Sequence, residues 1–514
     1  MAFSSAIVLT DLNDYIAPSQ ACIKPVEIQK ADKDAQGPTE IKVDKEGTYY
    51  EISQDDGQEK KLEKASITLN DCLACSGCVT SAESVLISMQ SLEEFTKVLE
   101  QNKYQRIVIS ISPQSRASLA AKYQLTPIQV QYRLVHFFKN ILGVHHVFDI
   151  AFTQDLSLVE AAREFVDRFR EYMANGGETA EKAIYEQQKQ EELEGGRPAR
   201  VRGARGQSRK TGESSSMPML ASSCPGWVCY AEKTHGDVLP HISTAKSPQQ
   251  MMGSLVKNYF AQKLGQAPSQ IYHVSVMPCY DKKLEASRPD FEVDGIRDVD
   301  CVLTTSEIDQ MLQSHHFLEM PEAPIDDMFN KVGIDPQTGQ QTLLGVPGSS
   351  SGGSLEYVLA AAARELFGLP TIEGRVTVKA GKNADICEYS LMSDDGRPVL
   401  RFASAYGFRN IQNLVRKIKQ GKCTYHYVEV MACPGGCANG GGQIVPVDVN
   451  PKEWLNQVEN IYRSVTGVWP EENETIKGIY NEWIGADDTK RKTILHTQYH
   501  AVTQSFQNPL ATKW

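Results

Sequence analysis

The sequence predicts an α/β protein built on parallel sheets, and two features of the chain indicate this class. The first is an alternation of apolar strands and helices. "RIVISI" (residues 106–111) has the composition of a buried strand, and "HHVFDIAF" (residues 145–152) has that of another after an intervening helix. The second is that three further short apolar stretches each lead through a cysteine motif toward a helix. Strands that alternate with helices are typical of parallel sheets.

Length and composition restrict the functional class. The chain has 514 residues, more than one hydrophobic core usually supports, so we expect several compact units. Its net charge of -11 disfavours a general binder of nucleic acid or of anionic membranes. The N-terminus has no basic region of the kind that opens a signal peptide, and no apolar run reaches the length of a membrane span. We expect a soluble intracellular protein.

Two further segments have clear local signals. Ser91 and Glu94 have the spacing of a capping box, and the residues that follow form an apolar helical stripe (Leu92, Phe95, Val98 and Leu99). Residues 186–217 are polar, glycine-rich and without periodicity. Such a composition predicts a disordered insertion, whose arginines are more simply explained by a solvated linker than by a binding surface.

The cysteine spacings indicate metal chemistry rather than disulfides, because disulfides are rare inside cells. "DCLACSGC" places Cys72, Cys75 and Cys78 in a C-x2-C-x2-C run, in which one loop can bring three thiolates to one centre. The fourth cysteine of the bacterial ferredoxin run is missing, since its position holds Ala82. A fourth ligand must come from elsewhere, and Cys22 is the nearest cysteine in sequence.

Four more cysteines follow predicted strands. Cys224 lies in "MPMLASSCPGW", Cys279 in "IYHVSVMPCYDKKLEA", and Cys433 and Cys437 in "YHYVEVMACPGGCANGGGQ". In open α/β sheets, ligands bind beyond the carboxyl ends of the strands, so these four thiols could converge on a second cluster. The glycines around the last pair would let backbone N–H groups approach the cluster sulfides.

Three alternatives remain at this point. Any one of these cysteines could be a buried structural residue, and this is the preferred interpretation for the four that lack such a context (Cys229, Cys301, Cys387 and Cys423). Zinc also takes four thiolates, although it usually uses paired knuckles. Nucleotide hydrolysis has little support, because "GVPGSSSGGS" (residues 345–354) lacks the lysine of a phosphate-binding loop. An anion or a cluster sulfide near the helix that follows this stretch remains open.

"SSCPGW", "MPCYDKKLE" and "EVMACPGGCANGGGQ" resemble, in this order, the three signature motifs of iron-only hydrogenases. The segment "IYNEWIG…KTILHTQYH" resembles the small-subunit segment of that family. With "LTDLNDYIAPSQACIKP" and "CLACSGC", the chain is similar to the eukaryotic hydrogenase-like proteins of cytosolic iron–sulfur assembly, the nuclear prelamin A recognition factor-like branch. The resemblance implies two parallel-sheet lobes around a buried cluster, with a small N-terminal cluster-binding region.

The predicted domain borders follow this resemblance. Residues 1–100 form a ferredoxin-like cluster region, and residues 101–330 form a first α/β lobe that contains the insertion. Residues 331–474 form a second lobe, and residues 475–514 form a small-subunit-like segment and tail.

The resemblance also implies two 4Fe–4S clusters. The ligands of the N-terminal cluster would be Cys22, Cys72, Cys75 and Cys78, and those of the buried cluster would be Cys224, Cys279, Cys433 and Cys437. In a hydrogenase the thiolate that matches Cys437 also bridges to a diiron subsite.

We expect no hydrogenase activity, because the position that supplies the proton-donating cysteine in hydrogenases holds Ser223. A hydroxyl has a far higher pKa than a thiol and is a poor proton shuttle at neutral pH. Lys282 and Glu285 match positions that contact the diiron ligand and relay protons in hydrogenases. Taken alone, they are better explained as a charge pair on a solvated helix face.

The family resemblance implies a carrier or adaptor in the cytoplasm, with the nucleus as a second location. It would pass clusters from a P-loop NTPase scaffold to a targeting complex that contains a WD40 propeller protein and its adaptors, for insertion into apoproteins. Trp514 at the C-terminus combines a large apolar face with a free carboxylate, which suits a pocket on that complex. The alternatives are a hydrogenase, or another redox enzyme with a diiron subsite, and a zinc-structured scaffold.

Overall fold

The computed structural model describes residues 39–43, 49–53, 59–61, 87, 89–193, 217–326, 328–381, 383–485 and 487–502. The chain divides into two compact units, residues 1–84 and residues 85–514. Five residues with predicted roles lie outside the described residues, namely Cys22, Cys72, Cys75, Cys78 and Trp514.

The described part of the first unit is a small antiparallel sheet. Its strands β1 (Thr39–Val43), β2 (Tyr49–Ser53) and β3 (Glu59–Lys61) pair in the order β1-β2-β3. Thr39 lies opposite Ser53 in the register of the first pair.

The second unit contains a four-stranded parallel sheet, here called the first sheet. It has the order β10-β7-β4-β5 and consists of β4 (Arg106–Ile111), β5 (His146–Asp149), β7 (Ile271–Met277) and β10 (Cys301–Thr304). Every residue of β7 is buried, as expected for a strand covered on both faces. Helices α3 (Leu92–Gln101), α4 (Pro113–Tyr123), α5 (Pro127–His136) and α12 (Thr305–Gln313) share one core with this sheet.

A five-stranded mixed sheet forms the other half of this unit and is called the second sheet. Its order is β13-β14-β15-β16-β6, in which β15, β16 and β6 run parallel and β13, β14 and β15 run antiparallel. The strands are β6 (Met219–Ala221), β13 (Val376–Ala380), β14 (Ile386–Met392), β15 (Pro398–Tyr406) and β16 (Tyr427–Met431). Phe402 stacks on Tyr427 with ring centroids 4.8 Å apart, and α13 (Ser354–Phe367) packs on the same core.

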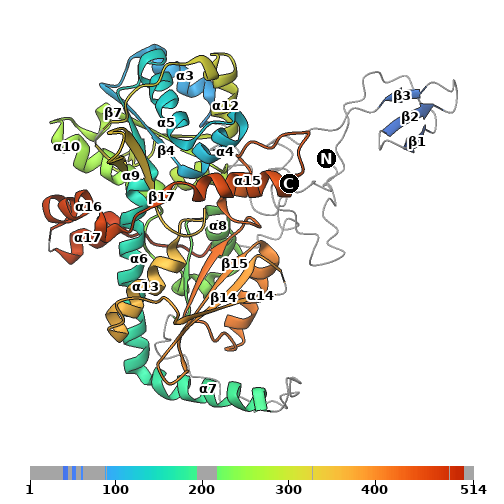
Figure 1. The fold of residues 1–514 in the computed structure, drawn as a ribbon. Coiled ribbons are helices and arrows are strands. Elements are labelled where there is room, and N and C mark those ends of the chain that lie inside the picture. Colours follow the sequence, from blue (N-terminus) through green and yellow to red (C-terminus); the bar gives the residue numbers. More distant parts are fainter. Residues whose placement is uncertain are drawn as a thin grey trace, which may run out of the picture. The chain divides into compact units, whose positions relative to one another are not determined.

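One long helix, α6 (Ile150–Tyr172), contributes to the cores of both sheets, as its course in Figure 1 shows. Phe152 and Leu156 near its start belong to a core that includes strands of the first sheet, and Phe165 and Phe169 farther along belong to the core of the second sheet. The helix therefore connects the two halves, and their relative placement depends on its packing.

The remaining elements include α15 (Pro451–Arg463), whose buried Trp454, Val458 and Tyr462 belong to the core of the first sheet. The helices are α7 (Glu178–Leu193), α8 (Pro225–Thr234), α9 (Pro248–Ser254), α10 (Ala261–Lys263), α11 (Asp281–Ala286), α14 (Phe408–Lys419), α15 (Pro451–Arg463), α16 (Glu474–Ile479) and α17 (Asp488–Leu495). The strands are β8 (Glu292–Val293), β9 (Ile296–Arg297), β11 (Val332–Ile334), β12 (Gln341–Gly345) and β17 (Thr466–Gly467). None of the described helices is both long and apolar enough to cross a bilayer.

Several sequence predictions are confirmed. The predicted strand at residues 106–111 is β4. Helix α3 begins after Ser91, whose hydroxyl accepts a hydrogen bond from the Glu94 amide at 3.3 Å. Phe95 and Val98 of its apolar stripe are buried.

Two local predictions are wrong in extent. The strand predicted for residues 145–152 ends at Asp149, because the Asp149 carboxylate accepts a hydrogen bond from the Ala151 amide and caps α6. The segment predicted to be disordered from residue 186 begins as helix, since α7 continues to Leu193. The domain borders stay a prediction, but β6, within the range assigned to the first lobe, pairs with β16 of the second sheet.

Candidate functional site

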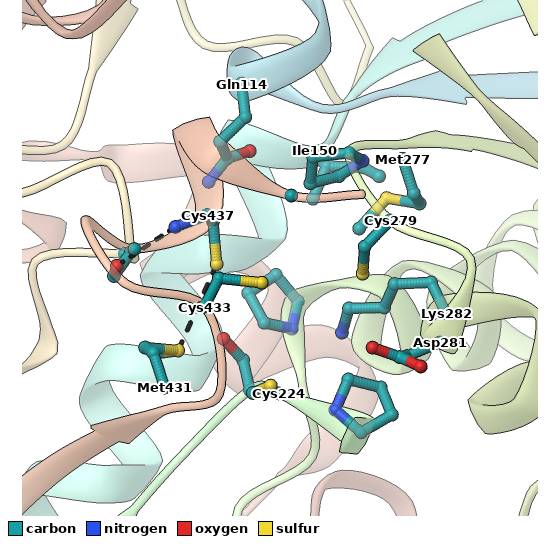
Figure 2. Close-up of a pocket in the computed structure, with 18 of the residues that line it drawn as sticks. Gln114, Ile150, Cys224, Met277, Cys279, Asp281, Lys282, Met431, Cys433 and Cys437 are labelled. Atoms are coloured by element: carbon teal, nitrogen blue, oxygen red, sulfur yellow. Dashed lines mark hydrogen bonds between the residues drawn. The ribbon is translucent and has the colours of Figure 1, made fainter. Parts of the chain in front are cut away.

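Three strand ends bring four cysteines to one cavity. Cys224 follows β6, Cys279 follows β7, and Cys433 and Cys437 follow β16. All four line a cavity with an empty volume of about 670 Å³, open space at its mouth included. Figure 2 shows their sulfur atoms facing a common space. The convergence agrees with the shared position of these residues after strands, and their role as ligands stays a prediction.

Local structure explains how Cys224 is held. It is the N-cap of α8, and Pro225 at the first helical position fixes the backbone as the chain leaves β6. The Cys224 amide donates to Ser222 Oγ at 3.1 Å, and Ser222 Oγ donates to the Val430 carbonyl of β16. The Ala432 amide donates to Cys224 Sγ at 3.4 Å. This cysteine is therefore tied directly to the strand that leads to Cys433.

The loop that carries Cys433 and Cys437 requires its glycines. Gly436 has φ +83°, and a Cβ there would clash with Ser351 Oγ. Gly440 has no room for a side chain either, because the Pro278 carbonyl lies against its Cα. Only residues without a Cβ let these segments approach so closely. The sequence predicts that these glycines let backbone N–H groups approach a cluster. In the structure they let the segments of Ser351 and Pro278 approach the cysteine loop.

The loop of residues 345–353, which precedes α13 and is here called the serine-rich loop, forms another wall of the cavity. Ser351 Oγ accepts a hydrogen bond from the Cys437 amide at 3.3 Å, and Ser350 Oγ accepts one from the Ala438 amide at 3.3 Å. Ser351 and Gly352 line the cavity. The sequence leaves open whether an anion or a cluster sulfide binds near the start of α13. The structure places the loop before this helix beside the four cysteines.

Burial and mutual repulsion keep the four thiols neutral. Burial, followed by the charge of Cys224, raises the pKa of Cys437 to about 12. Burial is also the largest cause of the raised pKa of Cys224, Cys279 and Cys433. A positively charged metal centre would offset this cost by binding the thiolates and releasing their protons.

The four thiols can be compared with the ligand sets of zinc and of an iron–sulfur cluster. Among the described residues, no group of three or more His, Cys, Asp or Glu side chains is preformed around one ion position. A zinc ion with four thiolates at about 2.3 Å would draw its sulfurs to within about 4 Å of one another. Four thiolates are also the donor set of a 4Fe–4S cluster, which binds each of them through a different iron.

Charged side chains from α11 lie beside the cysteines. Lys282 Nζ lies 3.1 Å from Glu285 Oε2, and both side chains are at most 10% exposed. The predicted charge pair is present, but the prediction of a solvated helix face is wrong. Gln249 of α9 and Ser247 each donate to Glu285 Oε2 at 2.9 Å, so this face is packed against protein.

Sequence reasoning missed Asp281, which lines the cavity beside Lys282 in Figure 2. Burial raises the pKa of Asp281, and its charge in turn contributes to the raised pKa of Cys279. The sequence signal that could have identified Asp281 is its position two residues after Cys279. Ser223, which precedes Cys224 in the chain, also lines the cavity.

The four cysteines interpreted as structural do not line this cavity. Cys301 is buried in the core of the first sheet, as predicted. Cys229, Cys387 and Cys423 are only partly buried.

Family comparisons agree with the motifs and the fold. The model for the C-terminal domain of the iron-only hydrogenase large subunit matches residues 105–181 and 201–441. The model for the iron hydrogenase small subunit matches residues 452–502.

Relatives match along the whole chain. The cytosolic iron-sulfur assembly component 3 of Mus musculus is 48% identical, with 100% of this chain and 99% of the relative covered. The cytosolic Fe-S cluster assembly factor narfl of Xenopus tropicalis is 47% identical with the same coverage.

Solved structures of FeFe hydrogenases share the fold. One, from work on oxygen inactivation of the H cluster, has a TM-score of 0.61 at 26% identity and covers 80% of this chain and 98% of its own. An apo FeFe hydrogenase from Chlamydomonas reinhardtii has a TM-score of 0.58 at 26% identity, covering 82% and 99%. With the ordered motifs and the cavity, these matches show that the chain belongs to the iron-only hydrogenase-like family, in its branch of cytosolic iron–sulfur assembly component 3 proteins.

Proposed function

We propose that this protein is a cytosolic iron–sulfur cluster assembly factor that binds two 4Fe–4S clusters and carries clusters from a scaffold to a targeting complex. The observation that carries the proposal is the cavity lined by Cys224, Cys279, Cys433 and Cys437, whose donor set suits a four-iron cluster. The names of the full-length relatives support the assembly role.

In this proposal the two clusters have different tasks. The cluster on Cys224, Cys279, Cys433 and Cys437 is permanent, because its ligands come from both sheets and are buried or partly buried. The cluster on Cys22, Cys72, Cys75 and Cys78 is the cargo. The proposed partners are a P-loop NTPase scaffold upstream and a WD40-containing targeting complex downstream, with Trp514 as the docking residue.

We further propose that the protein turns over no hydrogen. Ser223 supports this, because a serine beside Cys224 gives the cavity no thiol to deliver protons from that position. The zinc-structured alternative is disfavoured by the ordered hydrogenase motifs and by the family matches.

Composition analysis and cluster transfer test the proposal together. The full chain, purified without oxygen, should contain about eight irons with matching sulfide and give four-iron EPR signals when reduced. Incubation with the apo form of a 4Fe–4S recipient enzyme should restore that enzyme's activity. The double variant Cys72→Ala/Cys75→Ala should lose this transfer while keeping the buried cluster.

Three results would overturn the proposal in different ways. Full recipient maturation by the double variant would remove the carrier role. Zinc without sulfide would make the cysteines structural. Hydrogen evolution, with iron well above eight per chain, would indicate an active diiron subsite. The variant Cys387→Ser is the matched control, because Cys387 does not line the cavity.

A further inference from the structure

A pair of carboxyls, one buried (Glu429) and one half-buried (Glu356), lies next to the serine-rich loop, on the side of the second sheet. Glu429 on β16 is 1% exposed and accepts hydrogen bonds from Ser354 Oγ at 2.6 Å and from the Leu355 amide at 3.2 Å. These donors are the first two residues of α13, and Glu356 is the third. Glu356 Oε2 is buried without a hydrogen-bond partner. The two carboxyls interact through their charges, and one oxygen of Glu356 has no hydrogen-bond partner.

One proton is the natural occupant of this site. Burial, followed by the negative charge of Glu429, raises the pKa of Glu356 to about 7. Two close carboxylates in a region of low polarity cannot both ionise cheaply, so a proton remains on the pair near neutral pH.

The groups that face Glu356 leave this negative charge largely uncompensated. Arg463 of α15 lowers the pKa of Glu356, but Arg463 is 63% exposed and forms an ion pair with Glu459 at 3.4 Å. Two phenols also interact with both glutamates, Tyr389 of β14 and Tyr427 of β16, and burial together with these charges raises their pKa values. The pKa of Tyr406 of β15 is raised by burial and by Glu429.

A short chain of hydrogen bonds connects the pair to the cysteine cavity. Tyr406 Oη donates to Glu429 and lies 3.3 Å from Ser349 Oγ. Ser349 Oγ accepts from the Ser351 amide, and Ser351 Oγ accepts from the Cys437 amide. The charge of Glu429 is also among the causes that raise the pKa of Cys437. Charge at the carboxyl pair and charge at Cys437 therefore influence each other.

From this geometry we propose that Glu356 and Glu429 form a proton-binding site that takes up one proton when the group held by Cys437 gains one electron. The proposal rests on the buried cluster of the proposed function. The step balances, since the electron comes from a one-electron donor, the proton comes from solvent, and the net charge of the region is unchanged. Glu356 and Glu429 change the reduction potential of the group held by Cys437 through their charge, without contacting that group themselves.

The decisive measurement is the reduction potential of the buried cluster in the full chain between pH 6 and pH 9. Dithionite is the one-electron donor, and EPR follows the reduced signal. In the wild type the equilibrium constant for reduction should fall up to tenfold per pH unit above pH 7, which is about 59 mV for a one-electron couple. Glu356→Gln should abolish this slope. Glu388→Gln, which removes a carboxylate of β14 that accepts from Tyr425 and lies outside the pair, should keep it.

A second readout needs no cluster and separates the possible failures. Because Glu356 has a raised pKa in the folded state, this one carboxyl binds more proton in the folded apo chain than in the unfolded chain between about pH 4.5 and pH 7, and its contribution to stability falls as pH rises through this window. Relative to Glu356→Gln, the wild type should therefore lose free energy of unfolding as pH rises through this window.

Each outcome has one meaning. If the stability of wild type and Glu356→Gln follows pH in parallel, the carboxyl pair does not hold the proton and the proposal is wrong. If the stability result is as expected but the potential is independent of pH, coupling to Cys437 is absent and the proposal is again wrong. A chain that binds no iron while showing the stability result would instead refute the proposed function.

Discussion

The two sheets of the second unit contribute different things to the cavity. The first sheet supplies one cysteine, Cys279, and with it the charged side chains of α11. The second sheet supplies Cys224, Cys433 and Cys437, held in place by backbone amides and serine hydroxyls. The charged side chains beside the cavity thus come mainly from the first sheet, and the hydrogen bonds that hold the cysteines in place come mainly from the second sheet. Of the four predicted ligands, only Cys279 comes from the first sheet.

The largest expected effect comes from removing that one ligand. Cys279→Ser should lower the iron content by about four per chain, because a 4Fe–4S cluster needs four thiolates. Cys433→Ser should lose the same iron. Since either loss removes the cluster that would connect the two sheets, protease cleavage between the two halves should increase to a similar extent in both variants. Iron analysis and limited proteolysis measure both effects, with Cys387→Ser as the control. Unchanged iron in Cys279→Ser would contradict the ligand assignment.

The next effect compares one ion pair from each half. In the first sheet, Arg116 Nη1 lies 2.7 Å from Asp149 Oδ2, and both side chains are at most 1% exposed. Asp149→Asn leaves a buried guanidinium without its charge partner, so the free energy of unfolding should fall by about 3–5 kcal/mol. In the second half, Glu181 of α7 pairs with Arg401 at 2.8 Å and is 19% exposed. Glu181→Gln should cost about 1–2 kcal/mol, because solvent screens the pair.

The pH dependence distinguishes the Glu181 pair further. Burial alone would raise its pKa, but hydrogen bonds and charges from His426 and Arg401 outweigh burial and lower it to about 2. Burial lowers the pKa of His426, so at neutral pH the positive charge beside Glu181 comes from Arg401 rather than from His426. The stabilisation is therefore present above about pH 4.5 and is lost as pH falls toward 2. Urea unfolding at several pH values should show wild type and Glu181→Gln converging in acid. A constant difference would contradict the assignment.

The smallest effect concerns a helix cap on the first sheet. Ser91→Ala removes the hydroxyl that accepts from the Glu94 amide, and it should cost about 1 kcal/mol in thermal unfolding. The iron content should not change, because α3 does not line the cavity. Ser91→Asn, which preserves a capping acceptor, should restore most of the stability. A loss of iron in Ser91→Ala would show that the first sheet is coupled to the site by more than Cys279.

The sequence predicted the parts of the site that repeat a local pattern. A short apolar strand, a cysteine and a helix start appear within one segment, so Cys224 and Cys279 could be placed at strand ends without knowledge of pairing. The ligand assignments themselves came from the resemblance, and no structural observation tests the set at the N-terminus.

The parts that could not be predicted depend on contacts between distant segments. Ser351 meets the Cys437 amide across 86 residues of chain, and no local pattern announces this. Lys282 and Glu285 have the spacing of an exposed helix pair, yet packing by α9 buries them. The antiparallel strands β13 and β14 were not predicted either, because their residues are mostly half-buried or exposed and give no continuous apolar run.

The distribution of the four cavity cysteines along the chain has a consequence for biosynthesis. Cys224 emerges from the ribosome 213 residues before Cys437, which is the difference of their positions. At about 5–20 residues per second, Cys224 waits roughly 10–40 s for its last partner. During translation the cavity cannot yet exist, and its earliest thiol has no strand β16 to cover it. Under the proposed function, insertion of the buried cluster is therefore a late event in the life of each molecule.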